Sequence, residues 1–199
     1  MNLAKVALFL EETGLASGPM PVDTDNGEQP STAFRAINPN GKVAAFVDTD
    51  GPGGGPVRLF DSNAILLNLA EKTGQFPGTP EKRPELLSWF FVATSFAPFA
   101  GQVVYFPSAA SLWRDYAVYQ YLEDDLAGRD FILGENYTIV DIAGRGGIDQ
   151  GGSVLPGADD LLATYSNIKR WSAAIDVRAP VSRARQVNVD RPFKNELGE

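Results

Sequence analysis

The chain has 199 residues, enough for one domain or two small ones that bury most of their apolar surface, and its formal net charge is −8. This acidic balance argues against nucleic acid as a partner, because binding phosphates requires clustered lysine and arginine, and more weakly against anionic membranes. The sequence contains neither histidine nor cysteine, which excludes a Ser-His-Asp triad, a Cys-His pair, catalysis by a protein thiolate and nearly every zinc site.

Carboxylates, hydroxyls, amides, lysine and arginine remain as functional groups, so any thiol chemistry must use a sulfur that a substrate supplies. The N-terminus has no charged-then-apolar leader, and no apolar run has the length that spans a bilayer. The lack of cysteine also excludes disulfides. We therefore expect a cytoplasmic protein that does not insert into a membrane.

The first 47 residues predict a helix, a strand, a helical turn and a second strand. An apolar stripe at positions i, i+3, i+4 and i+7 from Leu3 predicts a helix of about three turns, which Gly14 ends. Residues 19–22 predict a short strand, and residues 31–37 predict a helical turn. Residues 43–47 are typical of a buried strand.

The most informative stretch is residues 59–74, which reads as a strand end, an acidic-hydroxyl pair and an amphipathic helix closed by Gly74. A loop over residues 50–56 makes residues 57–60 the hairpin partner of the preceding strand. Ser62 is the predicted N-cap. The free N–H groups of a helix N-terminus attract a carboxylate or phosphate, and Asp61 can hold an ammonium group, so a small zwitterion suits both. An ordinary capped helix after an edge strand explains the same residues.

The second half of the chain predicts an all-helical domain. Three prolines and two glycines mark residues 74–84 as a linker, so residues 1–73 form the predicted first domain. Helical periodicity within residues 85–185 predicts a second domain, and residues 186–199 form a polar tail.

A short motif, Thr138-Ile-Val-Asp141, predicts the start of a buried helix within this second domain. It is a capping box with Asp141 in place of the usual Glu or Gln, and Tyr137 and Ile142 stand at the positions of a hydrophobic staple. We therefore expect a structural role for Asp141, with catalysis as the minor alternative. The glycines that follow, at 144, 146 and 147, are poor helix formers and do not form a Walker A loop.

Several of these stretches together resemble the glutathione transferase family. The resemblance extends from Asn2 to about Arg183, and its opening segments are most similar to the bacterial Nu-class and fungal Ure2-like branch. It implies an α/β plus all-α fold, with a thioredoxin-like N-terminal domain that lacks its first strand, followed by the family's helical domain. The segments that carry it are residues 2–15, 23–29, 37–47, 59–74 and 131–141.

The resemblance also implies glutathione as cosubstrate, with no metal. Asp61 would take the γ-glutamyl ammonium, and Ser62 with its backbone N–H would take the neighbouring carboxylate. Val43 would pair its backbone with the cysteinyl portion, in the manner of an added strand.

Four more positions complete the implied site. Gln29 matches a polar residue of the Nu-like branch, and Lys42 would neutralise the glycine carboxylate, although a solvated loop lysine is an equal alternative. Asn2 falls where that branch places the asparagine that hydrogen-bonds the thiol. Arg114 is the nearest counterpart of an arginine that reaches towards glutathione.

The implied reaction uses the thiolate of bound glutathione. Hydrogen bonds and a nearby helix N-terminus would lower the pKa of that thiol, and the thiolate would attack a disulfide, a peroxide or an electrophilic carbon. Disulfide reduction is the activity associated with the Nu-like branch, and conjugation would be a detoxification chemistry. The expected partners are a small thiol, an electrophile or disulfide, and a second copy of the chain in a homodimer.

The chain departs from the family pattern in four places. The first strand is missing, Ala44 replaces a cis-proline so that a trans bond is expected, Val103 and Val104 replace two histidines, and no arginine aligns securely near Arg114. Binding therefore follows more directly than turnover, and a non-catalytic binding module is the alternative to an enzyme. An unrelated α/β protein that binds another amino acid or peptide is the third hypothesis.

Overall fold

The computed structural model describes residues 2–24, 26–105, 118–154 and 164–187. None of the described helices combines the length and hydrophobicity that crossing a bilayer requires. The elements appear in the order α1 (Asn2–Thr13), α2 (Thr32–Arg35), β1 (Ala45–Asp48), β2 (Val57–Phe60), α3 (Ser62–Thr73), η1 (Pro80–Lys82), α4 (Arg83–Tyr105), α6 (Val118–Asp125), α7 (Ile139–Val154), α9 (Ser166–Asp176) and α10 (Ala179–Gln186).

The sheet in the described part of the chain consists of the antiparallel pair β1 and β2, which confirms the predicted hairpin. Residues 19–22 form no strand, so that prediction is wrong. A strand needs a neighbour for its backbone groups, and neither β1 nor β2 pairs with this segment. β1 also begins two residues later than predicted and is not buried throughout, since Val47 is 41% exposed.

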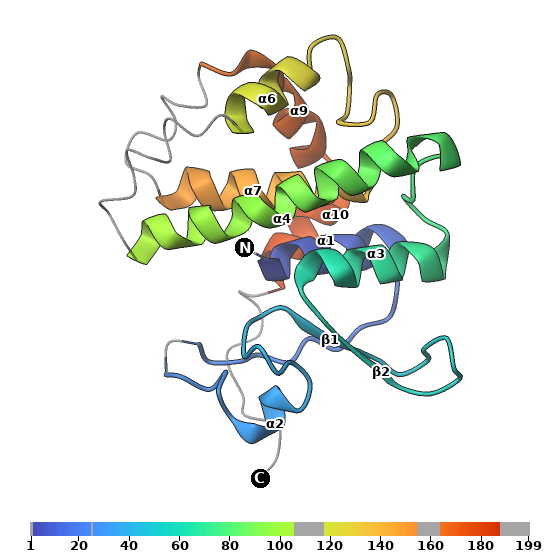
Figure 1. Cartoon of the computed structure of the whole chain (residues 1–199), viewed down its shortest axis with the longest axis vertical. Coiled ribbons are helices and arrows are strands. Elements are labelled where there is room, and N and C mark those ends of the chain that lie inside the picture. Colours follow the sequence, from blue (N-terminus) through green and yellow to red (C-terminus); the bar gives the residue numbers. More distant parts are fainter. Residues whose placement is uncertain (1, 25, 106–117, 155–163, 188–199) are drawn as a thin grey trace.

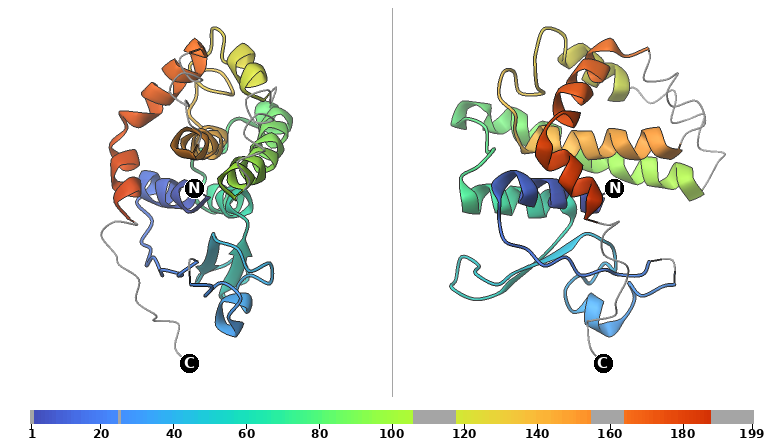
Figure 2. Two further views of the ribbon diagram at one scale, coloured as in Figure 1. Left: turned by 90° about the vertical axis from the view of Figure 1, so that its left-hand side faces the viewer. Right: turned by 180° about the vertical axis from the view of Figure 1, so that it is seen from behind.

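The core forms where α1, α3, α4 and α7 pack together. α1 and α3 lie side by side, and their N-terminal ends lie at the same end of the molecule (Figures 1 and 2). α7 packs against α1 on one side and against α4 on another. The buried apolar side chains of α1, α3 and α7 include Val6, Leu8, Phe9, Ile65, Leu66, Leu69, Ile139, Ile142 and Ile148.

The predicted capping box is present at the start of α7. The carboxylate of Asp141 accepts a hydrogen bond from the backbone N–H of Thr138 at 2.8 Å, and Thr138 Oγ1 accepts from the N–H of Val140 at 3.3 Å. Asp141 also accepts from Ile132 N at 3.0 Å and from Trp171 Nε1 at 2.9 Å. Burial raises the pKa of the Asp141 carboxyl group, and these donors oppose that rise. The role of this side chain in the structure is to join α7, α9 and the preceding loop.

Two glycines of α7 allow close packing that a side chain would prevent. A Cβ atom on Gly144 would lie 3.2 Å from Ile132 Cδ1, and one on Gly146 would lie 2.5 Å from Lys5 Cγ. The helix therefore accepts residues of poor helix propensity because larger ones would push its neighbours apart.

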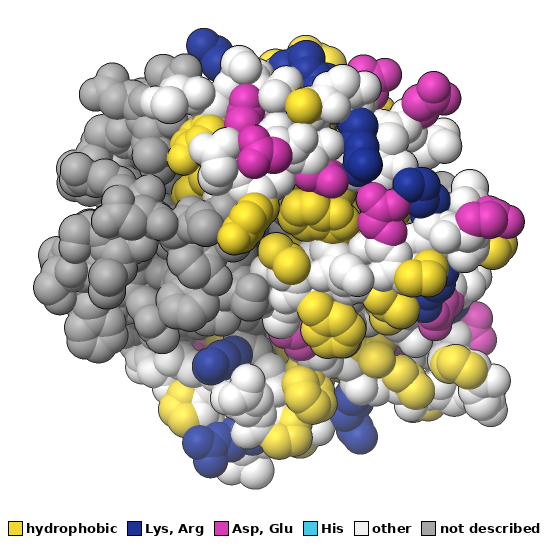
Figure 3. All heavy atoms as spheres, turned by 45° about the horizontal axis from the view of Figure 1, so that its top comes forward, with side chains coloured by type: hydrophobic (Ala, Val, Ile, Leu, Met, Phe, Trp, Pro, Cys, Tyr) yellow, Lys and Arg dark blue, Asp and Glu magenta, His cyan; other side chains and the backbone are white. Residues whose placement is uncertain are grey.

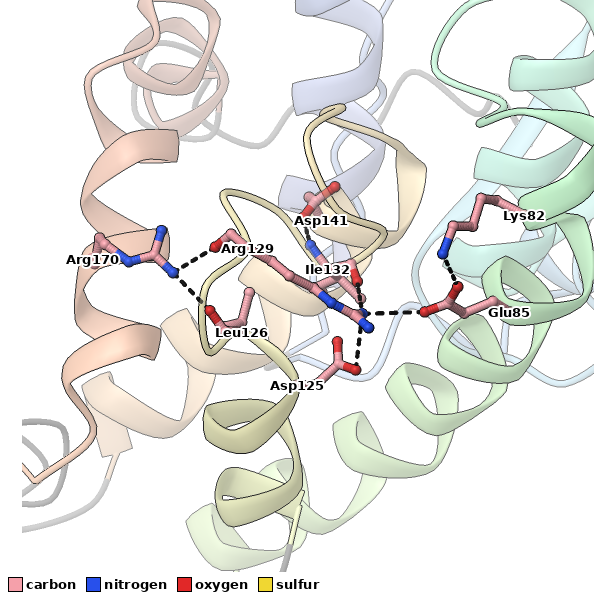
Figure 4. A network of polar contacts seen from close by, with 8 residues as sticks. All are labelled: Lys82, Glu85, Asp125, Leu126, Arg129, Ile132, Asp141 and Arg170. Carbon is pink, nitrogen blue, oxygen red and sulfur yellow. Dashed lines mark hydrogen bonds and ion pairs between the residues drawn. The ribbon is translucent and has the colours of Figure 1, made fainter.

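Side-chain pairs join helices that are distant in the sequence. Arg129 Nη1 lies 3.2 Å from Glu85 Oε1 on α4 and 3.1 Å from Asp125 Oδ1 on α6, while Arg170 Nη2 of α9 donates to the carbonyl oxygen of Leu126 at 2.8 Å (Figure 4). These charged groups are paired with one another and with backbone carbonyls of the segment that follows α6, so we assign them a structural role.

A second link connects the first helix of the chain with the last one described. Arg178, the N-cap residue of α10, donates from Nε to Glu12 Oε1 at 2.6 Å and from Nη2 to Glu12 Oε2 at 2.8 Å. The guanidinium carbon also lies 4.1 Å from the centre of the Tyr137 ring. α1 is therefore held by its C-terminal end as well as by its buried face.

Candidate functional site

The pair Asp61-Ser62 lies where β2 turns into α3. Asp61 is the N-cap, because its Oδ1 accepts from the backbone N–H of Asn63 at 2.9 Å and of Ala64 at 3.2 Å. The prediction that Ser62 is the N-cap is therefore wrong; Ser62 is the first helical residue, and it is buried. The backbone of Asp61, at φ 69°, places the carboxylate over the helix N-terminus, where a negative charge is favoured.

The register of the hairpin brings Val43 to the same place. Because Ala45 pairs with Phe60, the residues just before β1 lie opposite Asp61 and Ser62, just after β2. The Val43–Ala44 peptide bond is cis, so the expectation of a trans bond is wrong. Ala44 is buried in the core while Val43 is exposed, and this tertiary placement outweighs the local preference of a non-proline bond for trans.

Gln29 and Lys42 lie on the loop segments beside Val43. A Cβ atom on Gly41 would lie 3.4 Å from the carbonyl oxygen of Gln29, so these segments are in contact. Gln29 Nε2 donates to Thr24 O at 3.4 Å, while its Oε1 is buried and accepts no hydrogen bond from the described residues. The side chain of Lys42 is exposed, and its carbonyl oxygen accepts from Asn38 Nδ2.

The N-terminal turn of α1 supplies Asn2 and a residue that the sequence analysis missed. Asn2 Oδ1 is buried and accepts no hydrogen bond within the described part of the chain. Lys5 lies one turn further on, is only 2% exposed, and has its pKa lowered to about 8 by burial, against the attraction of Asp61. The available signal was that Lys5 precedes the apolar Leu8 and Phe9 by three and four residues, which places it on a second apolar face of the helix.

The structure thus brings Asn2, Val43 and Asp61-Ser62 to one end of the α1–α3 pair, with Gln29 and Lys42 on adjoining loops. Arg114 lies outside the described residues. An exposed carboxylate, a helix N-terminus and an exposed strand-edge backbone suit a zwitterionic peptide. No cluster of three carboxylates with the geometry of a metal site occurs in residues 2–24, 26–105, 118–154 and 164–187.

No protein-family model matches the chain. The disulfide-bond oxidoreductase YghU of Escherichia coli strain K12 is 34% identical over 222 residues, which cover 100% of this chain and 76% of that protein. The disulfide-bond oxidoreductase YfcG of the same strain is 35% identical and covers 92% of this chain and 89% of its own length. A glutathione transferase from Burkholderia graminis, solved with two glutathione molecules per subunit, has 33% identity and a TM-score of 0.85, covering 94% of this chain and 84% of its own.

The chain belongs to the glutathione transferase family. A family member from Pseudomonas putida, solved with one glutathione disulfide per subunit, has 29% identity and a TM-score of 0.86, and the match covers 94% of this chain and 87% of that one. As in the family, a thioredoxin-like domain precedes a helical domain, and in this member the described sheet is reduced to β1 and β2. The boundaries at 74 and 84 stay predictions.

Proposed function

We propose that this member of the family is a glutathione-dependent enzyme that reduces disulfides or conjugates glutathione to an electrophile. The observation that carries the proposal is the meeting of Asp61, the N-terminus of α3 and the exposed Val43 backbone in one place. These groups complement an ammonium, a carboxylate and a peptide backbone, which glutathione carries in that order. The two bacterial relatives named as disulfide-bond oxidoreductases favour disulfide reduction as the reaction.

In this proposal Asp61 uses its second carboxylate oxygen for the γ-glutamyl ammonium, since Oδ1 caps α3. The Ser62 hydroxyl and backbone N–H take the γ-glutamyl carboxylate, and the Val43 backbone pairs with the cysteinyl unit.

The other site residues act at the two ends of the ligand. Lys42 and Arg114 are proposed to neutralise carboxylate charge, and the buried Gln29 Oε1 offers an acceptor beside Lys42. Asn2 donates from its side-chain amide to the glutathione sulfur, since its Oδ1 faces the protein interior.

The reaction needs no protein thiol. The bound thiolate attacks one sulfur of a disulfide, forms a mixed disulfide with it and releases the other sulfur as a thiolate. A second glutathione thiolate then attacks the glutathione sulfur of the mixed disulfide, giving glutathione disulfide and the reduced product. Conjugation replaces the first step with attack on an electrophilic carbon.

Calorimetric titration of the chain with glutathione, and separately with glutathione disulfide, tests the proposal. Binding in the micromolar to low millimolar range, followed by turnover of a small disulfide, is the expected result. Folded protein that gives no heat with either ligand would contradict it.

A non-catalytic binding module is the second candidate. It is favoured by the groups that meet at Asp61, Ser62 and Val43, because they complement the ends and backbone of glutathione and none of them acts on its sulfur. Glutathione binding without turnover in disulfide-reduction and conjugation assays would select this candidate over the enzyme.

We also propose a homodimer, as the resemblance implies, in the cytoplasm. Hydrophobic side chains form a band across the centre and lower part of the face in Figure 3. Phe91 on α4 is 73% exposed and Phe60 at the end of β2 is 44% exposed, which supports a partner surface on these elements.

A further inference from the structure

Lys5 is a buried cation at the same end of α1 as Asn2. Only 2% of this residue is exposed to solvent. A lysine is almost never buried to this degree without a partner charge, because removing an ammonium from water is costly. Burial of this lysine therefore favours an anion close to its ammonium group.

The path of the Lys5 side chain is fixed by its neighbours. A Cβ atom on Gly146 of α7 would lie 2.5 Å from Lys5 Cγ and 2.8 Å from Lys5 Cε, so the aliphatic stem lies directly on that glycine. α7 thus has a residue of low helix propensity, Gly146, at the point where the stem of Lys5 crosses it.

The charges around Lys5 come from three helices. Asp61, at the start of α3, is the group whose attraction opposes the lowering of the Lys5 pKa by burial. Arg145 on α7 and Arg185 on α10 line the same hollow as Lys5, and both pair with Asp176, at 2.9 Å and 2.8 Å. The charge of Asp61 therefore favours the ammonium form of Lys5 in the free protein.

Binding of glutathione would change this balance. In the proposed function, the ligand's ammonium occupies Asp61, which offsets the attraction of Asp61 for Lys5. The thiol beside Asn2 would lie about one helical turn from Lys5 on the same side of α1. If the thiol gives its proton to solvent, the thiolate becomes the anion nearest Lys5, and the burial of Lys5 strengthens their attraction.

We propose that Lys5 is a further functional residue of the glutathione site, a buried ammonium that favours the thiolate of glutathione bound beside Asn2. This inference rests on the proposed function. It also gives Gly146 a functional reason, since the stem of Lys5 lies where a side chain at position 146 would stand.

The test is the pKa of protein-bound glutathione, measured by the ultraviolet absorbance of its thiolate across pH. Lys5→Met keeps an unbranched stem of similar length and removes the charge; we expect it to raise the thiol pKa by about 1 or more. Gly146→Ala keeps the charge but displaces the stem, and we expect a smaller rise in the same direction. Lys169→Met, at an exposed position on α9, is the matched control and should leave the thiol pKa unchanged.

A second measurement uses the unaltered chain. Glutathione should raise the pKa of Lys5, which NMR of labelled lysine can measure. S-methylglutathione forms no thiolate but still occupies Asp61, so it should lower the pKa of Lys5. Equal effects of the two ligands, or variants that bind glutathione with the wild-type thiol pKa, would overturn the role of Lys5 while leaving the proposed function intact. If the wild type binds no glutathione at all, both fail together.

Discussion

At the scale of single residues, Asp61 caps α3 and, in the proposed function, also binds the ammonium group of glutathione. One carboxylate oxygen satisfies the free N–H groups of α3, and the side chain remains exposed at the end of the helix. Its backbone at φ 69° lies in a region that favours glycine, so the surrounding structure must hold it there. A substitution of Asp61 can therefore change the stability of the fold and the affinity for the ligand by different amounts.

Replacing Asp61 by asparagine separates the two tasks. Asparagine caps helices as well as aspartate does, so Tm should fall less than in Asp61→Ala, whereas loss of a charge-assisted bond should weaken glutathione binding by about 1.5–3 kcal/mol. Asp61→Ala should lose both properties. Calorimetry and thermal denaturation of the two variants measure the difference; wild-type affinity in Asp61→Asn would place the ligand's ammonium elsewhere.

Ser62→Ala tests the neighbouring carboxylate contact. We expect glutathione affinity to fall by about 1–2 kcal/mol, the size of a hydrogen bond to a charged group. The side chain is buried and serine is not the cap, so the helix should persist, which circular dichroism can verify. An unchanged dissociation constant would show that the hydroxyl does not contact the ligand.

At the scale of elements, the structural role of Asp141 can be measured directly. Asp141→Ala leaves the buried N–H groups of Ile132, Thr138 and Trp171 without their acceptor, so we expect a loss of at least about 3 kcal/mol in the free energy of unfolding. The exposed Asp124, on α6, provides the control Asp124→Ala, with an effect below about 0.5 kcal/mol. A stable Asp141→Ala variant without activity would instead favour the catalytic alternative.

The link between the hairpin and α3 depends on pH in a defined direction. The hydrogen bond and charge of Lys72, at 2.8 Å, hold the pKa of the Asp48 carboxyl group below its usual value, and the same pair raises the pKa of Lys72. A lowered carboxyl pKa stabilises the fold above the usual value of about 4, and this stabilisation is lost as the pH falls through the folded pKa. A raised lysine pKa adds stability below its usual value of about 10.4.

We therefore expect Lys72→Met to lower Tm at neutral pH, with a difference from wild type that shrinks as the pH falls below about 4. Lys169→Met, at an exposed position, should show no such pH dependence. Thermal denaturation across this pH range supplies the measurement. A constant difference at all pH values would mean that lost packing of the lysine stem, and not the ion pair, is what Lys72 contributes.

At the scale of the whole molecule, the exposed aromatic side chain of Phe91 makes the proposed homodimer testable. Light scattering should give the mass of two chains, and Phe91→Ser should weaken association by at least about 2 kcal/mol if the side chain lies at the centre of the interface. Val177, which is 84% exposed at the end of α9, gives the control Val177→Ser. A monomeric wild type would remove the homodimer proposal.

Sequence patterns predicted the elements that are defined by local signals. The stripe from Leu3 to Leu10, the stop at Gly74 and the capping box at Asp141 each depend on neighbours within a few residues, and each is present. The strand at residues 19–22 depends on a distant hydrogen-bonding partner, which no local pattern reports.

For the candidate site, the sequence indicated residues that the structure brings together, among them Asn2, Val43 and Asp61, but not their geometry. The cis bond before Ala44 goes against the local preference for trans, whereas the cap falls on Asp61 and not on Ser62 although both residue types cap helices well. Lys5 was missed because its burial arises from Gly146, which follows it by more than a hundred residues.

The bond between Glu12 and Arg178 bears on the order in which the chain acquires its shape. These side chains are 166 residues apart, so α1 gains this anchor only after the chain through Arg178 has been synthesised. Until Arg178 is made, α1 is held by its packing against α3 and α7, without the ion pair at its C-terminal end. A nascent chain arrested just before Arg178 should thus leave the C-terminal end of α1 more open to proteases, and completion of α10 should protect it.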